Sequence, residues 1–159
     1  MNARQNPFFS VSTLPYQTPP FDQIEEQDFL PALQAGIEEK RQEIEAIALN
    51  SDAPSFFNTY EALERSGQLL NRVNLVFSAM TSAHTSPYLQ QVDEEIAPQL
   101  TALNDDIMLN RPLFSRLDAV YLQRAKLDAE SKRLVEVIWQ RFQLAGLICR
   151  KRRNSSSRH

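Results

Sequence analysis

The sequence has 159 residues, of which 42% are hydrophobic and 23% are charged, and it contains only 3 glycines. These values are typical of a globular protein of one domain, exclude disordered and collagen-like chains, and favour long helices over turn-rich β structure. The net charge of -3 hides a basic cluster near the C-terminus. The acidic remainder of the chain has no electrostatic reason to bind nucleic acid.

Residues 1–27 form the first predicted segment, which contains four prolines and little hydrophobic periodicity. Because proline fixes φ and lacks a backbone N–H donor, we expect an extended Pro-containing arm here rather than a helix. The arm must lie against other parts of the protein, because its apolar residues need cover. These residues are Phe8, Phe9, Leu14, Tyr16, Phe21 and Ile24.

The first predicted helix begins at Asp28, which can act as its N-cap, and Pro31 suits its first turn. It runs to Leu49, with apolar residues at helical spacing. They are Leu33, Ile37, Ile44 and Ile47.

The second predicted helix begins near Asn58, because Asn58 followed by Glu61 resembles a capping box. It runs to about Ala83 as one continuous helix through the Ser66-Gly67 pair. Its apolar stripe consists of Phe56, Tyr60, Leu63, Leu70, Val73, Phe77 and Met80.

Ser86 followed by Pro87 is a strong start signal for a third helix. Its apolar positions are Leu89, Val92, Ile96, Leu100, Leu103 and Ile107. Pro98 lies inside this pattern and predicts a kink. Asn110 with Pro112 ends the third helix and begins a shorter fourth one.

Asp128 or a neighbour is the expected cap of a fifth helix, which ends at Gly146. Its apolar residues leave little polar face, so we expect it to be the most deeply packed helix. They are Leu134, Val135, Val137, Ile138, Trp139, Phe142 and Ala145. The sequence therefore predicts an all-α fold, an antiparallel helical bundle of about five helices over residues 28–146, with an extended N-terminal arm.

Residues 147–159 have a different character, being basic and rich in serine. The basic cluster consists of Arg150, Lys151, Arg152 and Arg153, with Arg158 beyond it. This cluster could hold phosphates or anionic lipid. It lacks interleaved aromatic residues, so accidental composition of a tail is the favoured interpretation.

No catalytic, cofactor-binding or metal-binding residue is predicted. The only histidines, His84 and His159, are isolated, and the His-Glu-x-x-His motif and Gly-rich phosphate loops are absent. We expect His84 to face the C-terminal end of the second helix, with a ligand or base as the minor alternative. Trp139 and Phe142 are expected in the core or an interface. The acidic groups predicted to form solvated helix faces are Asp93, Glu94, Glu95, Asp105 and Asp106.

A single cysteine, Cys149, excludes an intramolecular disulfide and fits a reducing compartment. No apolar run follows Arg4 as it would in a signal peptide, and no stretch of about 18 apolar residues could span a membrane. We therefore predict a cytoplasmic protein with no membrane partner.

Several short motifs follow one another along the chain. Near the N-terminus they are Asn6-Pro7-Phe8, Leu14-Pro15-Tyr16, Pro20-Phe21-Asp22-Gln23-Ile24, and Phe29-Leu30-Pro31-Ala32 followed by Gly36. Further on they are Leu63-Glu64, Ser66-Gly67-Gln68-Leu69-Leu70, Val76-Phe77-Ser78-Ala79-Met80-Thr81, Leu134-Val135-Glu136-Val137-Ile138 and Arg141-Phe142-Gln143-Leu144-Ala145-Gly146. In this order they resemble the thimet-oligopeptidase-like zinc peptidases, most closely the bacterial peptidyl-dipeptidases, over nearly everything up to Gly146.

The resemblance implies that these N-terminal helices form one wall of a deep channel that admits short peptides and excludes folded proteins. It also implies that the zinc ligands and the general base come from a helical region much later in the chain. None of those positions exists in this sequence. The resemblance therefore assigns no catalytic or metal residue here, and it places the zinc and the short-peptide substrates with the intact relative.

From Leu147 onward the sequence departs from the family pattern. This departure predicts a truncated N-terminal segment, inactive by itself, with a tail derived from a frameshift. Apolar helix faces that pack on later helices in the family would then be exposed, and self-association through them is expected. A free-standing helical module that binds peptides or a protein partner is the alternative, and binding of nucleic acid or membrane surfaces through the tail ranks last.

Overall fold

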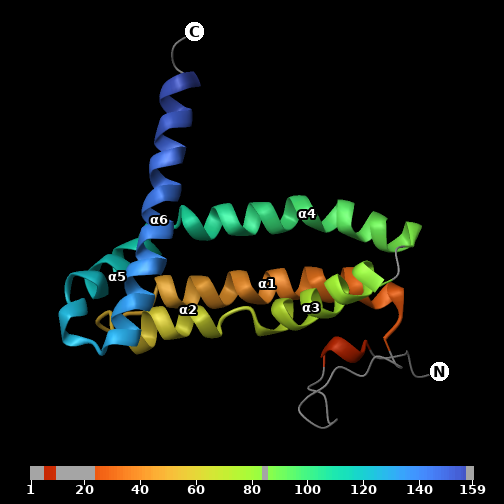
Figure 1. The fold of residues 1–159 in the computed structure, drawn as a ribbon, viewed down its shortest axis with the longest axis horizontal. Helices are drawn as coiled ribbons and strands as arrows, with labels where there is room; N and C mark the ends of the chain where they lie inside the picture. Colours follow the sequence, from red (N-terminus) through yellow and green to blue (C-terminus); the bar gives the residue numbers. More distant parts are fainter. Residues whose placement is uncertain (1–5, 10–23, 84–85, 157–159) are drawn as a thin grey trace. The chain divides into compact units, whose positions relative to one another are not determined.

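The computed structural model describes residues 6–9, 24–83 and 86–156. Within these ranges all regular structure is helical, and five helices have seven residues or more (Figure 1). The predicted all-α fold with about five helices is confirmed. These helices are α1 (Phe29–Ala48), α3 (Gln68–Ala83), α4 (Pro87–Met108), α5 (Arg111–Leu122) and α6 (Ala129–Ser156).

The chain divides into two compact units that the sequence did not indicate. Unit 1 comprises Met1–Gln42 with Gly67–Ala102, and unit 2 comprises Glu43–Ser66 with Leu103–His159. The division falls inside α1 and α4, so each of these helices supplies residues to both units. Each unit has a core of its own.

The core of unit 1 is centred on Phe29, whose side chain is completely buried. Its ring centroid lies 5.5 Å from that of Phe8 and 5.3 Å from that of Phe77. The Arg72 guanidinium fixes the arm by donating a 2.7 Å hydrogen bond to the carbonyl oxygen of Phe8. Phe8 and Ile24 are therefore covered as predicted, whereas Phe9 is half exposed.

Most described residues of the arm lie in 3-10 turns, although Glu25 has an extended backbone. Pro7–Phe9 (η1) and Glu26–Asp28 (η3) form 3-10 turns, because Asn6 and Glu25 offer local hydrogen bonds at their starts. Asp28 accepts the Glu25 backbone N–H and so completes a capping box ahead of α1. Leu14, Tyr16 and Phe21 lie outside the described residues.

The predicted second helix is wrong in two respects. The capping box is formed by Ser55 and Asn58, whose side chains each accept a hydrogen bond from the other's backbone N–H, and not by Asn58 with Glu61. The helix that follows is also broken, since Gly67 has φ 73°, a left-handed conformation that interrupts a right-handed helix. The segment therefore consists of a π-helical piece, η4 (Phe56–Glu61), the short α2 (Ala62–Arg65), and α3.

The predicted starts of the third, fourth and fifth helices are confirmed by side-chain caps. Ser86 Oγ accepts from the Leu89 backbone N–H at 3.1 Å, and Asn110 Oδ1 accepts from that of Leu113 at 3.0 Å. Asp128 Oδ2 accepts from the Ser131 backbone N–H at 3.1 Å. These interactions satisfy N–H groups that have no partner within the first turn of a helix.

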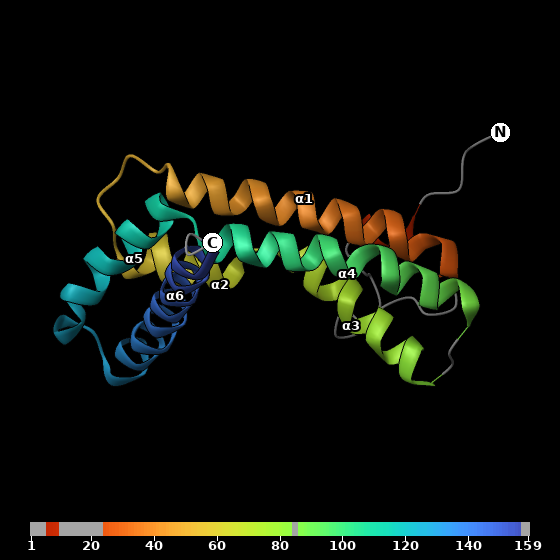
Figure 2. The ribbon, with the colours of Figure 1, turned by 90° about the horizontal axis from the view of Figure 1, so that it is seen from above.

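The predicted end of the last helix at Gly146 is wrong, because α6 continues to Ser156. Leucine, lysine and arginine, which dominate the residues after Gly146, are good helix formers and outweigh one glycine. The helix is also not the most deeply packed one. It buries Val135, Ile138 and Phe142, but Leu144 is 60% exposed, because α6 packs along one side on α5, which lies beside it in both views (Figure 2).

Arg116 joins α5 to the chain segment that precedes η4 in unit 2. Its side chain is buried and donates to the backbone carbonyl oxygens of Asn50 and Asp52 at 2.8 and 2.9 Å. It also donates to Asn58 Oδ1 at 3.1 Å. A single guanidinium thus fixes two backbone acceptors in the segment that lacks regular structure before Phe56, and one side-chain acceptor in η4.

Candidate functional site

The residues that could carry chemistry do not converge in the described part of the chain. Among the side chains that the structure describes, no three His, Cys, Asp or Glu residues gather as ligands of one metal ion. His84 and His159 lie outside the described residues.

The other groups singled out in the sequence have structural positions. The five acidic residues predicted to form solvated faces on α4 are all exposed. Trp139 stacks on Tyr121 with ring centroids 3.9 Å apart, and its Nε1 donates to Asp118 at 3.0 Å. Phe142 is buried. Both aromatic residues therefore belong to the packing between α5 and α6, as predicted.

Tyr60 is the described side chain with the largest change in acidity. It is completely buried, and its hydroxyl donates a 2.8 Å hydrogen bond to the Leu117 carbonyl oxygen. Burial, and to a lesser extent the nearby Asp118 and Tyr121, raises the pKa of Tyr60 above its ordinary value. The hydroxyl faces a backbone carbonyl in a filled core, so its role is structural.

We expect this burial to make unit 2 sensitive to alkaline pH. An unfolded tyrosine ionises near pH 10 and the folded Tyr60 does not, so Tyr60 leaves stability unchanged below about pH 10. Above it the unfolding free energy should fall by up to about 1.4 kcal/mol per pH unit. Urea unfolding between pH 8 and 11, followed by fluorescence of the single Trp139, measures this.

The Tyr60→Phe variant should lose about 1 kcal/mol at neutral pH with its hydrogen bond, and should show a smaller decline above pH 10. Tyr88→Phe, at an exposed position, is the matched control and should retain the decline. An equal decline in wild type and Tyr60→Phe would refute this origin of the pH dependence.

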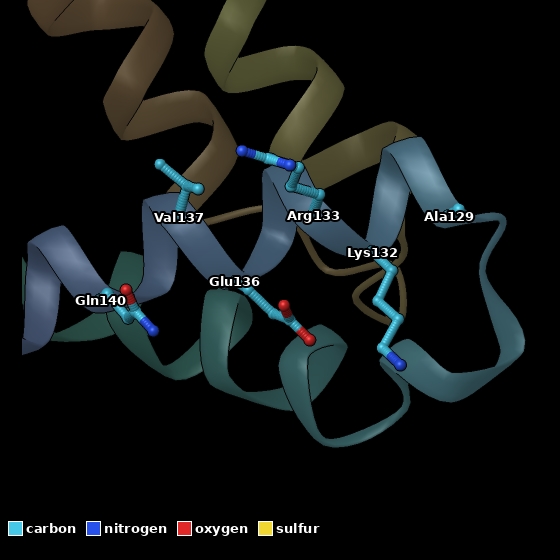
Figure 3. A pocket seen from close by; sticks show the side chains of 6 residues that line it. All are labelled: Ala129, Lys132, Arg133, Glu136, Val137 and Gln140. Atoms are coloured by element: carbon cyan, nitrogen blue, oxygen red, sulfur yellow. The ribbon is translucent and has the colours of Figure 1, made fainter.

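Two of the surface hollows formed by described residues lie on unit 2. The first has a volume of about 480 Å³, and all its lining residues come from α6. Figure 3 shows that Lys132 and Glu136 point to one side of the helix while Arg133 and Val137 point to the other. Because these groups do not converge on a common point, this hollow is not a binding site.

The second hollow, the α5–α6 groove, lies where α4 ends, α5 begins and α6 passes. Its volume is about 410 Å³. It is lined by Met108, Leu109, Asn110, Arg111, Phe114, Ser115, Phe142, Gln143, Gly146, Leu147, Arg150 and Arg153. The sequence analysis did not predict this groove. Arg150 and Arg153, which lie on α6 beyond Gly146 and line the groove, were a signal that could have indicated it. It is the best candidate for a site that receives another molecule or segment.

In the described ranges, no helix is both long enough and apolar enough to cross a membrane.

Comparison with known proteins gives the relationship directly. No family model matches the chain. Two curated proteins, both called dipeptidyl carboxypeptidase, do match. The protein from Escherichia coli (strain K12) is 55% identical over 143 residues, and that from Salmonella typhimurium (strain LT2) is 54% identical over 143 residues.

Each match covers 89% of this chain and 21% of the relative, so the chain spans about a fifth of the length of the curated relatives it matches. The resemblance predicted from the short motifs is confirmed. Over the matched residues, this chain is homologous to a segment of the dipeptidyl carboxypeptidases.

Proposed function

We propose that this chain supplies a non-catalytic helical part of a dipeptidyl carboxypeptidase, forming wall and packing surface while the reacting groups lie elsewhere. The supporting observation is the identity of 54–55% over 143 residues with two proteins of that name. At this level of identity, the helices and their buried contacts are expected to be shared. In this proposal the complete enzyme acts on short peptides in the cytoplasm with zinc.

The described side chains support a structural role. Phe29 and Tyr60 fill cores, while Arg72 and Arg116 tie irregular segments to helices through backbone carbonyl oxygens. The α5–α6 groove has apolar walls and arginines, but it holds no carboxylate or histidine that could serve as a general base.

We expect the purified chain to release no dipeptides from the carboxyl end of a short N-blocked peptide, with or without added zinc. Co-expression with the E. coli relative lacking the segment that this chain matches should restore release. Product is measured by chromatography, and a chelator-treated sample shows whether the restored activity needs metal. Zinc-dependent release by the chain alone would contradict the proposal, and so would failure of the two polypeptides to associate.

A free-standing interaction module is the second candidate. Leu109 and Leu147 favour it, because they are 46% and 50% exposed in the same groove and neighbouring exposed apolar side chains mark interfaces more often than scattered ones do. Saturable binding of short peptides by a folded monomer, without any association with the remainder of the relative, would support this function instead.

A further inference from the structure

The last turns of α6 place the basic cluster on a helix. Residues 150–153 are all basic and all exposed, and α6 continues beyond them to Ser156. Figure 1 shows these turns extending away from α5, the helix on which earlier turns of α6 pack. Because the residues from Leu147 onward depart from the family pattern, their charge concerns the partners of this chain and not those of its relatives.

Exposed leucines lie beside these charges on the same helix. Leu144 and Leu147 are exposed, and residues three apart lie on one side of a helix. Arg150 and Lys151 follow Leu147 at the next turn, so they continue that side. This side of α6 therefore presents apolar side chains followed directly by basic ones.

The neighbouring wall of the α5–α6 groove has the same character. It contributes Leu109 and Arg111, which are both exposed. None of the described residues that line the groove is acidic, and Asp105 and Asp106 of α4 do not belong to the lining. Leu147 lines the groove as well, so the side of α6 and the groove wall form one apolar and basic surface.

This combination of side chains suits the surface of an anionic lipid bilayer. Lysine and arginine attract lipid phosphates, and their methylene stems allow the charged ends to stay at the headgroups. Leucines beside them can enter the boundary with the acyl chains. Nucleic acid fits this surface less well, because no aromatic residue lies among residues 150–153 to stack on bases.

We propose that the last turns of α6, together with Leu109 and Arg111 of the groove wall, bind the surface of an anionic lipid bilayer. The sequence-based prediction had no membrane partner and ended the last helix at Gly146. The helical position of the basic cluster, next to exposed leucines, is the observation that changes this expectation. The inference concerns this chain alone and does not depend on the proposed function.

The test mixes the full chain with sedimentable vesicles and measures the bound fraction. The chain should bind vesicles of equal parts phosphatidylglycerol and phosphatidylcholine but not vesicles of phosphatidylcholine alone, and added salt should weaken the binding. Arg150→Gln with Lys151→Gln should lower the apparent affinity about tenfold or more. Lys132→Gln with Arg133→Gln removes the same charge from exposed positions earlier on α6 and should leave the affinity unchanged.

A second pair of variants tests the contribution of the leucines. Leu144→Gln with Leu147→Gln should lower the affinity about tenfold. Both side chains are exposed, so circular dichroism should show the helix content of the wild type. Leu75→Gln with Leu122→Gln changes two exposed leucines outside the proposed surface and should bind as the wild type does.

Several outcomes would overturn the inference. Equal losses in the two charge variants would show that net charge alone drives binding, and an unchanged affinity of the Leu144 and Leu147 variant would remove the apolar contact. Equal binding to both kinds of vesicle, or to neither, would also contradict the proposed surface. Salt-sensitive binding of a DNA duplex by a chain that leaves the vesicles unbound would make nucleic acid the partner instead. None of these measurements uses peptidase activity, so their failure would leave the proposed function standing.

Discussion

Replacing Arg116 with methionine should lower the unfolding free energy of unit 2 by about 3 kcal/mol. Arg116 is buried and donates to three acceptors on Asn50, Asp52 and Asn58. Hydrogen bonds from a charged donor contribute about 1.5–3 kcal/mol each, and water reaching some of the freed acceptors offsets part of the loss. The expected change is large against a total stability of roughly 5–15 kcal/mol.

Urea unfolding followed by Trp139 fluorescence measures this effect, because the only tryptophan lies in unit 2. Arg116→Lys should give an intermediate loss, since an ammonium group keeps the charge but cannot reproduce the planar fork of donors. Arg141→Met, at an exposed position of α6, is the control and should change stability by less than about 0.5 kcal/mol. Equal stabilities of Arg116→Met and the control would show that the three hydrogen bonds do not stabilise the fold.

Replacing Gly36 with alanine should destabilise unit 1 by about 1 kcal/mol. The new Cβ atom would lie 2.8 Å from the Leu70 Cα atom and 2.9 Å from its backbone nitrogen, so α1 and α3 must separate. Overpacking of this kind costs about 1–3 kcal/mol, more than the roughly 1 kcal/mol that alanine gains over glycine in a helix. Circular dichroism during thermal unfolding measures the net loss.

Gly146→Ala is the matched control, since it makes the same substitution inside a helix where no described atom lies within 4 Å of the new Cβ. It should raise stability by up to about 1 kcal/mol. The prediction for Gly36 fails if both alanine variants are stabilised equally.

Helix starts were predictable from the sequence because a cap is a local interaction. Ser86, Asn110 and Asp128 each accept a backbone N–H three residues ahead, within one turn. The same local logic chose the wrong pair near residue 58, since Ser55 with Asn58 and Asn58 with Glu61 both fit a capping pattern. Apolar spacing did not resolve the choice, because both alternatives lead into the same stripe.

The candidate site was not predictable in this way. The groove combines residues 108–115 with residues on α6, and it is open because no described atom lies within 4 Å of a Cβ atom placed on Gly146. The sequence pattern around a helical glycine does not show whether another backbone covers it. At Gly36 the Leu70 backbone does so, whereas at Gly146 no described atom does. Expecting α6 to end at Gly146 removed Leu147, Arg150 and Arg153 from consideration as groove residues.

The helical class, most helix boundaries and the relationship to dipeptidyl carboxypeptidases could be predicted from the sequence. These follow from hydrophobic periodicity, helix caps and the order of short motifs, all of which depend on residues close together in the sequence. Tertiary structure alone decided the break at Gly67, the division into two units, the three-acceptor role of Arg116 and the exposed side of α6. Each of these depends on contacts between residues that are far apart in the sequence. The geometry of such contacts sets their free energy, and local secondary-structure propensity gives no information about that geometry.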